Sequence, residues 1–242
     1  KALIAYTGMR KAKHIIVNSR SVREEIVDHL RYPRDKITVA PLGVDKSFKP
    51  IKDLKEIRKK YNLDNKHKYL IYVGNEEPRM NIDTILKALK ISNIKDLKLI
   101  KVGSANYPGM RNKTLNQVKK LNLEKDIIFT DYVPEEDLPY LYNIADIAIY
   151  IPSIAGFGLP PLESMSCGTP TIGSNTSCIP EVIEKAGILV NPRSPEDLAE
   201  NIKIILSNKQ LAKDLSQKGQ EQATKFTWEN FIKQTVHVYK NL

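Results

Sequence analysis

Two loops of this chain combine glycine with charged side chains in a pattern that suits an anion. The longer loop, 152–163, carries Gly156 and Gly158, which let the backbone turn tightly and approach a ligand closely. Pro160 and Pro161 follow, and proline is well tolerated in the first turn of a helix. A helix that begins here would point free amides and its positive dipole end at the glycines. The pattern therefore predicts an anion site that suits a pyrophosphate.

Glu163 lies about one turn into this predicted helix. Its carboxylate is placed to accept hydrogen bonds from a neutral diol such as a ribose. Glycine pairs also precede helices in α/β proteins that bind nothing there, and Glu163 could equally be an ordinary first-turn acid that interacts with the helix dipole. The residues alone leave both interpretations open.

The shorter loop, 74–81, is a weaker signal for the same kind of site. It joins a predicted strand to a predicted helix and contains Gly74, Asn75 and one cation, Arg79. In an open α/β sheet, ligands bind on the loops at the carboxyl ends of the strands. We therefore expect both loops to lie at the same edge of the sheet.

The elements that position these loops are apolar runs that alternate with stretches of helical period. The runs are apolar throughout, which is expected when helices cover both faces of a parallel sheet. Repeated strand–helix units imply right-handed crossovers, so the predicted fold class is α/β with a doubly wound parallel sheet. The predicted strands are 69–74, 97–103, 127–130, 147–151, 171–173 and 188–190, and the predicted helices are 81–90, 111–121, 135–143, 159–165, 195–206, 209–218 and 228–239.

The first forty residues are predicted to be separate from this sheet. They contain strands at 14–18 and 37–39, and a helix that runs to about Leu30 and that residues 19–21 could cap. Two strands cannot make a sheet of their own, so they either belong to an element outside this chain or pack as an appendage. Residues 41–50 are rich in turn formers and are predicted to be a linker.

The composition limits the classes of partner. The 242 residues include 41% hydrophobic residues, enough for a core, and carry a net charge of +10. Such a charge can attract nucleic acid, anionic lipid or phosphorylated small molecules. The lysines are spread along the chain among glutamates, without an arginine and aromatic stripe, so we expect no nucleic-acid partner. An even spread is typical of a lysine-rich proteome such as that of a thermophile.

No apolar run approaches the roughly 18–20 residues that a membrane-spanning helix needs. Residues 1–8 lack the apolar segment of a signal peptide and do not begin with Met, so we expect a piece of a longer protein. Cys167 and Cys178 lack the spacing of a zinc site and are expected to be reduced and buried. These features favour a cytoplasmic protein, with peripheral contact to the anionic cytoplasmic face of a membrane as the alternative.

The stretch 152–170, PSIAGFGLPPLESMSCGTP, resembles the signature of retaining glycosyltransferases of the GT-B fold, in particular family 4, the group 1 glycosyl transferases. Residues 39–45 with Phe48 resemble the interdomain linker of that family, and residues 72–81 resemble its first donor loop. The resemblance covers nearly the whole chain, since further positions also fall in register: Asp146, 179–182, 186–187 and 226–229.

The resemblance implies two Rossmann-like domains that face each other across a cleft. The C-terminal domain would bind a nucleotide-diphosphate sugar, and the N-terminal domain would supply most of the acceptor site. Residues 1–40 would end the acceptor domain, 41–50 would be the linker, 51–224 the donor domain, and 225–242 a helix that crosses back to the acceptor domain. Most of the acceptor domain would then be missing, so we expect this chain alone to be inactive.

The resemblance also assigns roles to residues. Glu163 would bind the ribose hydroxyls and, together with Arg79, would be catalytic. No metal or other cofactor would be needed, because helix amides and basic side chains would meet the charge of the departing diphosphate of a UDP-, GDP- or ADP-sugar. Residues 132–134 would pass beside the base. The expected substrate-binding residues are Gly74, Asn75, Gly103, Ser104, Tyr132, Val133, Ala155, Gly156, Phe157, Gly158, Leu159 and Glu163.

The chain departs from the family pattern at the donor site. The family usually has a second glutamate eight positions before Glu163, and Ala155 stands there. Its first donor loop usually offers an arginine and a lysine to the phosphates, and the positions that we assign to them are Glu76 and Met80. Two lost cations beside a diphosphate would cost on the order of several kcal/mol of transition-state stabilisation. Arg79 remains in the loop as a substitute, with Lys101 and Arg111 as candidates from outside it.

Three functions follow from these observations. The first is an enzyme that transfers a hexose from a nucleotide-diphosphate sugar to a glycan or lipid-linked acceptor with retention of configuration. The second is a non-catalytic, regulatory relative with a degenerate donor site, which Ala155, Glu76 and Met80 motivate. The third is a basic module that binds nucleic acid or a membrane surface, and only the net charge supports it.

Overall fold

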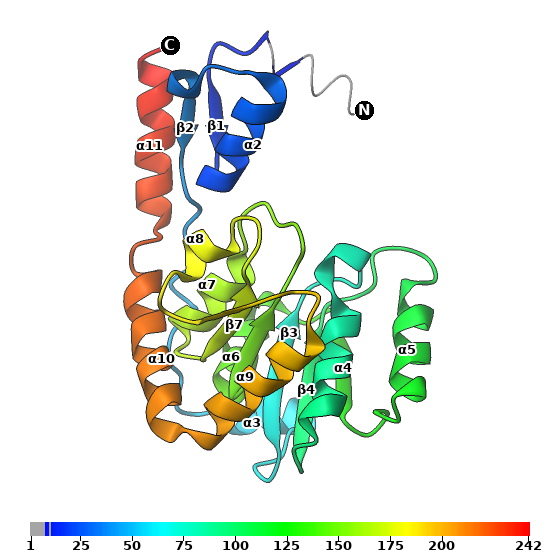
Figure 1. The fold of residues 1–242 in the computed structure, drawn as a ribbon. Helices are drawn as coiled ribbons and strands as arrows, with labels where there is room; N and C mark the ends of the chain where they lie inside the picture. Colours follow the sequence, from blue (N-terminus) through cyan, green and yellow to red (C-terminus); the bar gives the residue numbers. More distant parts are fainter. Residues whose placement is uncertain (1–7, 10) are drawn as a thin grey trace.

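The main body of the molecule is a six-stranded parallel sheet with helices on both faces (Figure 1). The structure is a computed structural model that describes residues 8, 9 and 11–242. The strand order is β5-β4-β3-β6-β7-β8, and all neighbours are parallel. The predicted doubly wound α/β fold is therefore confirmed. The strands of this sheet are β3 (Lys68–Val73), β4 (Leu97–Val102), β5 (Ile127–Asp131), β6 (Ile147–Tyr150), β7 (Thr171–Ser174) and β8 (Ile188–Val190).

The helices of the main body alternate with these strands. They are α3 (Lys55–Lys60), α4 (Ile82–Ser92), α5 (Met110–Lys120), α6 (Leu138–Ile144), α7 (Leu159–Ser166), α8 (Ile179–Ile183), α9 (Pro195–Ser207) and α10 (Lys209–Ala223).

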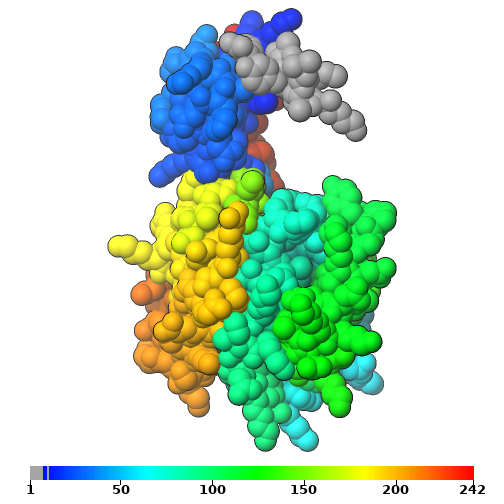
Figure 2. All heavy atoms as spheres, turned by 45° about the vertical axis from the view of Figure 1, so that its right-hand side comes forward, coloured from blue at the N-terminus to red at the C-terminus, as the bar shows by residue number. Residues whose placement is uncertain are grey.

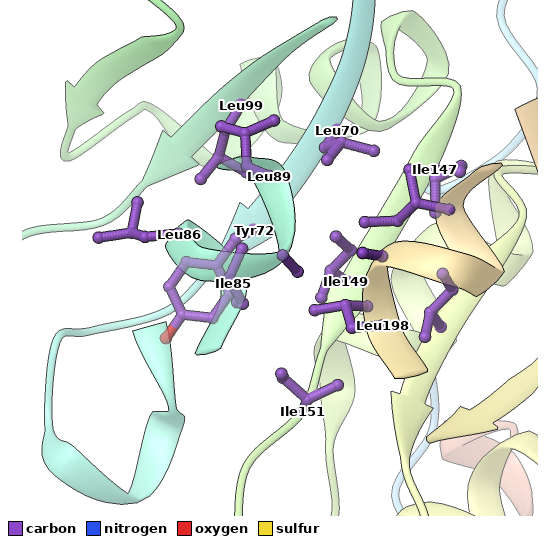
Figure 3. Packing of buried hydrophobic residues seen from close by; sticks show 14 of the residues in the cluster. Leu70, Tyr72, Ile85, Leu86, Leu89, Leu99, Ile147, Ile149, Ile151 and Leu198 are labelled. Carbon is purple, nitrogen blue, oxygen red and sulfur yellow. The ribbon is translucent and has the colours of Figure 1, made fainter. Parts of the chain in front are cut away.

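The two faces of the sheet are buried in two separate apolar clusters, as the continuous apolar runs require. In β3, Leu70 and Tyr72 belong to one cluster, and Tyr69 and Ile71 belong to the other. Figure 3 shows the first cluster, in which side chains of β3 and β6 meet those of α4 and α9. The second cluster includes residues of α3 and α6. Helices thus pack on both faces of the sheet, and this packing fixes the positions of the strand ends.

Three details differ from the predicted elements. The short helices α3 and α8 were not predicted, because five or six residues are too few to show a helical period. Residues 135–137 form a single 3-10 turn, and α6 begins only at Leu138. Helix α10 was predicted to end at Lys218, but it continues through Gly219. A Cβ at Gly219 would lie 3.2 Å from Cγ of Met165, so glycine lets α10 pack closely on α7.

A small second unit lies at one end of the main body (Figure 1). Strands β1 (Ile15–Val17) and β2 (Ile37–Val39) pair in parallel, and α2 (Arg20–Leu30) connects them. Ser19 caps α2, since its hydroxyl accepts a hydrogen bond from the amide of Val22. Helix α11 (Trp228–Lys240) contacts β2. The expectation that two strands cannot make a sheet of their own is therefore wrong: β1 and β2 form a two-stranded sheet, which α2 and α11 contact. Residues 1–7 and 10 of the predicted acceptor-domain segment lie outside the described residues.

The chain passes between the two units twice, and the two passages touch. The first follows β2 through residues 41–50, and the second joins α10 to α11. The amide of Val44 donates to the carbonyl of Phe226 at 3.2 Å. A Cβ at Gly43 would lie 2.1 Å from the backbone nitrogen of Trp228. The close backbone contact therefore requires glycine at position 43. The assignment of these segments to a linker and a crossing helix stays a prediction.

We expect Gly43→Ala to lower the free energy of unfolding by about 1–3 kcal/mol, because the added methyl group forces two backbone segments apart. Chemical denaturation measures this loss. Gly156→Ala is the stability control, since its Cβ would meet only one side-chain atom, at 3.9 Å. Equal stability of the Gly43→Ala variant and the wild type would contradict the required close approach.

Candidate functional site

The two glycine-containing loops leave adjacent strands. The first loop, 74–81, follows β3, and the second, 151–158, follows β6. The chain winds from β3 outward to β4 and β5 on one side, and β6, β7 and β8 lie on the other. The carboxyl ends of β3 and β6 therefore flank the point where the strand order reverses, which is where open α/β sheets bind ligands.

Hydrogen bonds join the two loops into one surface. The Asn81 side-chain amide donates to the carbonyl of Ile151 at 2.8 Å and to the hydroxyl of Ser153 at 2.9 Å. The amide of Ser153 donates to the carbonyl of Arg79 at 2.7 Å, and Nη1 of Arg79 donates to the carbonyl of Ile154 at 3.2 Å. The predicted common edge is thus a bonded contact between the loops.

The second loop offers backbone amides that are free in the described part of the chain. The N–H groups of residues 156–159 donate no hydrogen bond there. The source of the amides differs from the sequence prediction. Pro160 and Pro161 occupy the positions after Leu159 at the start of α7 and have no N–H, so the first turn of the helix contributes only the amide of Leu159. The glycine loop supplies the others, next to the positive end of α7.

Gly158 sets the direction of this loop. It has φ of 101°, a left-handed conformation that favours glycine. A Cβ there would also lie 2.8 Å from Cδ1 of Ile179. Phe157, by contrast, is buried with its ring 5.9 Å from that of Phe226, so its side chain belongs to the core and only its backbone faces the loop.

Glu163 lies on α7, one turn beyond the free amides, and is partly exposed. The hydroxyl of Tyr142 donates to Oε2 of Glu163 at 2.9 Å. Burial raises the pKa of Glu163 to about 7, the hydrogen bond from Tyr142 lowers that pKa, and the charge of Glu135 raises it. The site therefore holds a carboxylate whose charge changes near neutral pH.

Arg79 lies where the two loops meet. Its side chain is about half exposed, and Nε lies 2.6 Å from Oε2 of Glu77. The ion pair with Glu77 and the hydrogen bond to the carbonyl of Ile154 hold the guanidinium against the second loop, which also contains the free amides. Arg79 is thus the cation of the first loop that the structure brings to the second.

Lys101 and Arg111 are not free to replace the missing cations, which corrects the sequence-based expectation. Lys101 is fully buried, and its Nζ donates to the carbonyl groups of Gly74, at 3.0 Å, and Gly103. It also lies 3.2 Å from Oε1 of Glu76, and Nε of Arg111 donates to the same oxygen at 2.7 Å. Both cations are occupied by the buried Glu76 carboxylate.

This cluster of Glu76, Lys101 and Arg111 is the feature that sequence analysis missed. Glu76 was interpreted only as a lost cation, but it is 3% exposed and serves as an internal counter-charge. The available signal was Lys101 itself, a lysine between the apolar residues Ile100 and Val102, two positions before Gly103. Its effect is to tie the loops after β3 and β4 together.

The other predicted site residues of the loops after β3, β4 and β5 lie around this charged cluster. Gly103 needs to be glycine, because a Cβ would lie 2.7 Å from the carbonyl oxygen of Gly74. Ser104 is exposed and lies just after β4, and the side-chain oxygen of Asn75 accepts from the amide of Glu77 at 3.1 Å. On the next loop, Tyr132 is 80% exposed whereas Val133 is buried in the core.

Ala155 is buried in an apolar cluster with Leu162 and Cys178. Its amide donates to the hydroxyl of Ser177, and its carbonyl accepts from that hydroxyl at 2.8 Å. Cys178 and Cys167 are both buried free thiols, as predicted. The position of the family's second glutamate is therefore part of the core of this chain.

The small N-terminal unit also contacts this site. The hydroxyl of Ser19 donates to the carbonyl of Gly156 at 3.3 Å. The carboxylate of Glu181, in α8, accepts from the backbone amides of Arg20 and Ser21 at 2.8 and 2.5 Å. Figure 2 shows the blue N-terminal unit seated on the yellow part of the main body near α8. The second loop thus lies at the junction of the two units.

Neither a metal centre nor a membrane span stands out in the part of the chain that the structure describes. No group of three or more His, Cys, Asp or Glu side chains there is arranged to hold a metal ion. No helix among the described residues combines the length and apolar character needed to cross a bilayer. The expectation that no cofactor is needed stays a prediction.

We expect Glu163→Gln to stabilise the fold at alkaline pH. A carboxyl whose pKa is raised by folding, from 4.5 to about 7, favours the native state while protonated. Its contribution is complete below pH about 4.5 and is lost as the pH rises through 7. The variant should therefore exceed the wild type by about 2–3 kcal/mol at pH 8.5, with little difference at pH 4. Denaturation at both pH values measures this, with exposed Glu200→Gln as the control. If Glu163→Gln were no more stable than the wild type at pH 8.5, burial of the charged Glu163 carboxylate would not destabilise the fold.

We expect Lys101→Met to destabilise the fold by about 3–5 kcal/mol, because it leaves the buried Glu76 carboxylate without its lysine partner. Lys101→Met combined with Glu76→Met should recover part of the loss. Denaturant midpoints of the single and double variants measure both effects. Lys98→Met, on the same strand and partly exposed, is the control. A Lys101→Met variant as stable as the control would show that the cluster does not hold the loops.

Comparisons with known proteins agree with the observed fold. Residues 53–222 match the family described as "Glycosyl transferases group 1", and residues 1–48 match "Glycosyltransferase Family 4". The O-antigen chain mannosyltransferase B of Escherichia coli is 33% identical over 240 residues, which cover 98% of this chain and 63% of that protein.

Two solved structures share the fold. Anabaena HepE, solved in complex with UDP-glucose, matches with a TM-score of 0.88 and 20% identity over 96% of this chain and 64% of that chain. The C-terminal domain of a Francisella tularensis group 1 family glycosyl transferase matches with a TM-score of 0.68 and 24% identity, over 76% of this chain and 97% of that domain. This chain spans about 63% of the length of its Escherichia coli relative. Since the group 1 model covers most of its residues, the chain belongs to the group 1 glycosyl transferases of the GT-B fold.

Proposed function

We propose that this chain carries the donor site of an enzyme that transfers a hexose from a nucleotide-diphosphate sugar to a glycan or lipid-linked acceptor with retention of configuration. The observation that carries the proposal is the run of free amides at residues 156–159, one turn before Glu163, in a loop whose Ile154 carbonyl accepts a hydrogen bond from Arg79. In a group 1 glycosyl transferase, this arrangement at the sheet's reversal point suits a nucleotide diphosphate.

Each part of the site has a role in this proposal. The loop amides and the start of α7 receive the diphosphate, whose charge grows as the sugar departs. Arg79 supplies a positive charge at the same place. The Glu163 carboxylate accepts hydrogen bonds from the ribose hydroxyls. Tyr132, exposed on the neighbouring loop, lies where the base would pass. No step depends on a metal ion.

The relatives narrow the proposed substrates. The Escherichia coli relative is a mannosyltransferase that acts on O-antigen chains, which supports a mannosyl donor and a glycan acceptor. Exposed apolar side chains of α11, including Ile232, Val236 and Tyr239, line the face that further acceptor-domain chain would cover. We place the whole protein in the cytoplasm, with peripheral contact to an anionic membrane where the acceptor is lipid-linked.

A second candidate is a non-catalytic relative that binds a nucleotide sugar weakly, or not at all, and serves as a regulatory or structural partner. Ala155 and Met80 stand where the family places charged donor contacts, and both are buried apolar side chains here. Lys101 and Arg111 are paired with Glu76, so neither adds positive charge for the diphosphate beside Arg79. This candidate predicts weak or absent nucleotide binding, without turnover.

Calorimetric titration with UDP, GDP, ADP and their sugar conjugates tests the donor site, both in this chain and in the full-length protein. We expect one nucleotide to bind with a Kd of roughly micromolar to sub-millimolar order. Glu163→Ala should weaken binding by roughly 10- to 100-fold, because hydrogen bonds to a charged acceptor are lost. Glu200→Ala, an exposed acid on α9, is the matched control.

Transfer assays on the full-length protein separate the two candidates. Turnover of the bound donor that Glu163→Ala abolishes supports the enzyme. Binding without transfer or hydrolysis of any donor favours the regulatory relative. Flat titrations across the whole panel, in the chain and in the full-length protein, would contradict the enzyme and favour a relative whose donor site has decayed.

A further inference from the structure

Tyr142 is a buried tyrosine whose hydroxyl faces the proposed donor site. It lies on α6, is 1% exposed, and donates its hydroxyl hydrogen to Oε2 of Glu163 at 2.9 Å. Its ring packs edge-on against Phe48, with centroids 6.1 Å apart. Its backbone carbonyl accepts from the hydroxyl of Thr169 at 2.7 Å. These contacts fix the tyrosine in one position, so its hydroxyl is a fixed donor.

Among the described residues, the Glu163 carboxylate has no other side-chain hydrogen-bond partner. No described residue donates a hydrogen bond to its Oε1. The last side-chain torsion of a glutamate is broad, so the plane of a free carboxylate varies. A hydrogen bond from a rigid donor to Oε2 selects one plane and leaves Oε1 open to a ligand. A side chain that is ordered before binding loses less conformational entropy when the ligand binds.

We infer that Tyr142 is a positioning residue for the donor nucleotide: its hydroxyl holds the Glu163 carboxylate in the plane, and in the charged form, that accepts the ribose hydroxyls. The inference rests on the proposed function, because it takes Glu163 as the ribose acceptor. It adds a residue that does not touch the donor and acts only through Glu163.

The surroundings of Glu163 make this hydrogen bond important for its charge. Burial raises the pKa of Tyr142 far above its usual value, and burial raises the pKa of both Tyr150 and Cys167 to about 12. These neighbours are therefore neutral near pH 7. The charged neighbour that acts on Glu163 is Glu135, which opposes ionisation. The hydroxyl of Tyr142 is the contact that favours the charged carboxylate.

The test is the pH dependence of nucleotide binding in the full-length protein. UDP and GDP are titrated by calorimetry between pH 5.5 and 9 into the wild type and Tyr142→Phe. We expect wild-type affinity to fall as the pH drops below about 7. Tyr142→Phe should weaken nucleotide binding roughly 3- to 10-fold at pH 7 and by a smaller factor at pH 9. The midpoint of the pH dependence of affinity should lie about 0.5–1 pH unit higher than in the wild type. Tyr140→Phe, which removes a hydroxyl from the same helix, should match the wild type.

The Glu163→Gln background distinguishes positioning from a merely structural role. Since glutamine does not titrate, adding Tyr142→Phe to Glu163→Gln should cause no pH-dependent loss of nucleotide affinity. The effects of the two substitutions on the free energy of binding should be strongly non-additive. The inference would be overturned if Tyr142→Phe lowered the affinity equally, and independently of pH, in the wild type and in Glu163→Gln. It would also be overturned if the midpoint of the pH dependence of affinity in Tyr142→Phe were the same as in the wild type. If Glu163→Gln weakens binding but Tyr142→Phe does not, the inference fails and the proposed function stands. If Glu163→Gln binds like the wild type, the ribose contact fails, and the inference fails with it.

Discussion

The hydrogen bonds between the loops after β3 and β6 are the interaction on which the candidate site depends. Asn81 and Arg79 of the first loop bind carbonyl groups of Ile151 and Ile154 in the second. They can do so because β3 and β6 are parallel neighbours, so both strands end at the same edge. The apolar clusters on the two faces hold the strands in register. A site assembled from residues seventy positions apart is thus fixed by the packing of the sheet.

The same edge contains buried charges that cost stability. Burial raises the pKa of the Glu163 carboxyl, and Lys101 and Glu76 are buried, with Arg111 partly exposed, beside the glycines that follow β3 and β4. An apolar replacement of such groups is often neutral or stabilising. Their presence is understandable where they order a ligand site: Lys101 fixes the carbonyl groups of Gly74 and Gly103, and Glu163 supplies an acceptor.

Sequence reasoning reached the fold and the loops because both have local signatures. The strands are largely apolar runs, and Gly156 and Gly158 precede a helix with prolines in its first turn. What it missed depends on tertiary contacts. The role of Glu76 follows only from its approach to Lys101 and Arg111, and Gly219 could not be recognised as a helix-packing residue without Met165. The short helices α3 and α8 carry no period to detect. The origin of the free amides was readable in principle, since prolines lack the N–H group.

The central claim is that the loop amides and Glu163 form one nucleotide site. A crystal structure of the full-length protein with the nucleotide diphosphate that binds it tests this most directly. The account predicts phosphate oxygens within hydrogen-bond distance of the amides of residues 156–159, the Arg79 guanidinium beside them, and a ribose hydroxyl on Oε1 of Glu163. A nucleotide bound elsewhere, with those amides facing only water, would contradict it.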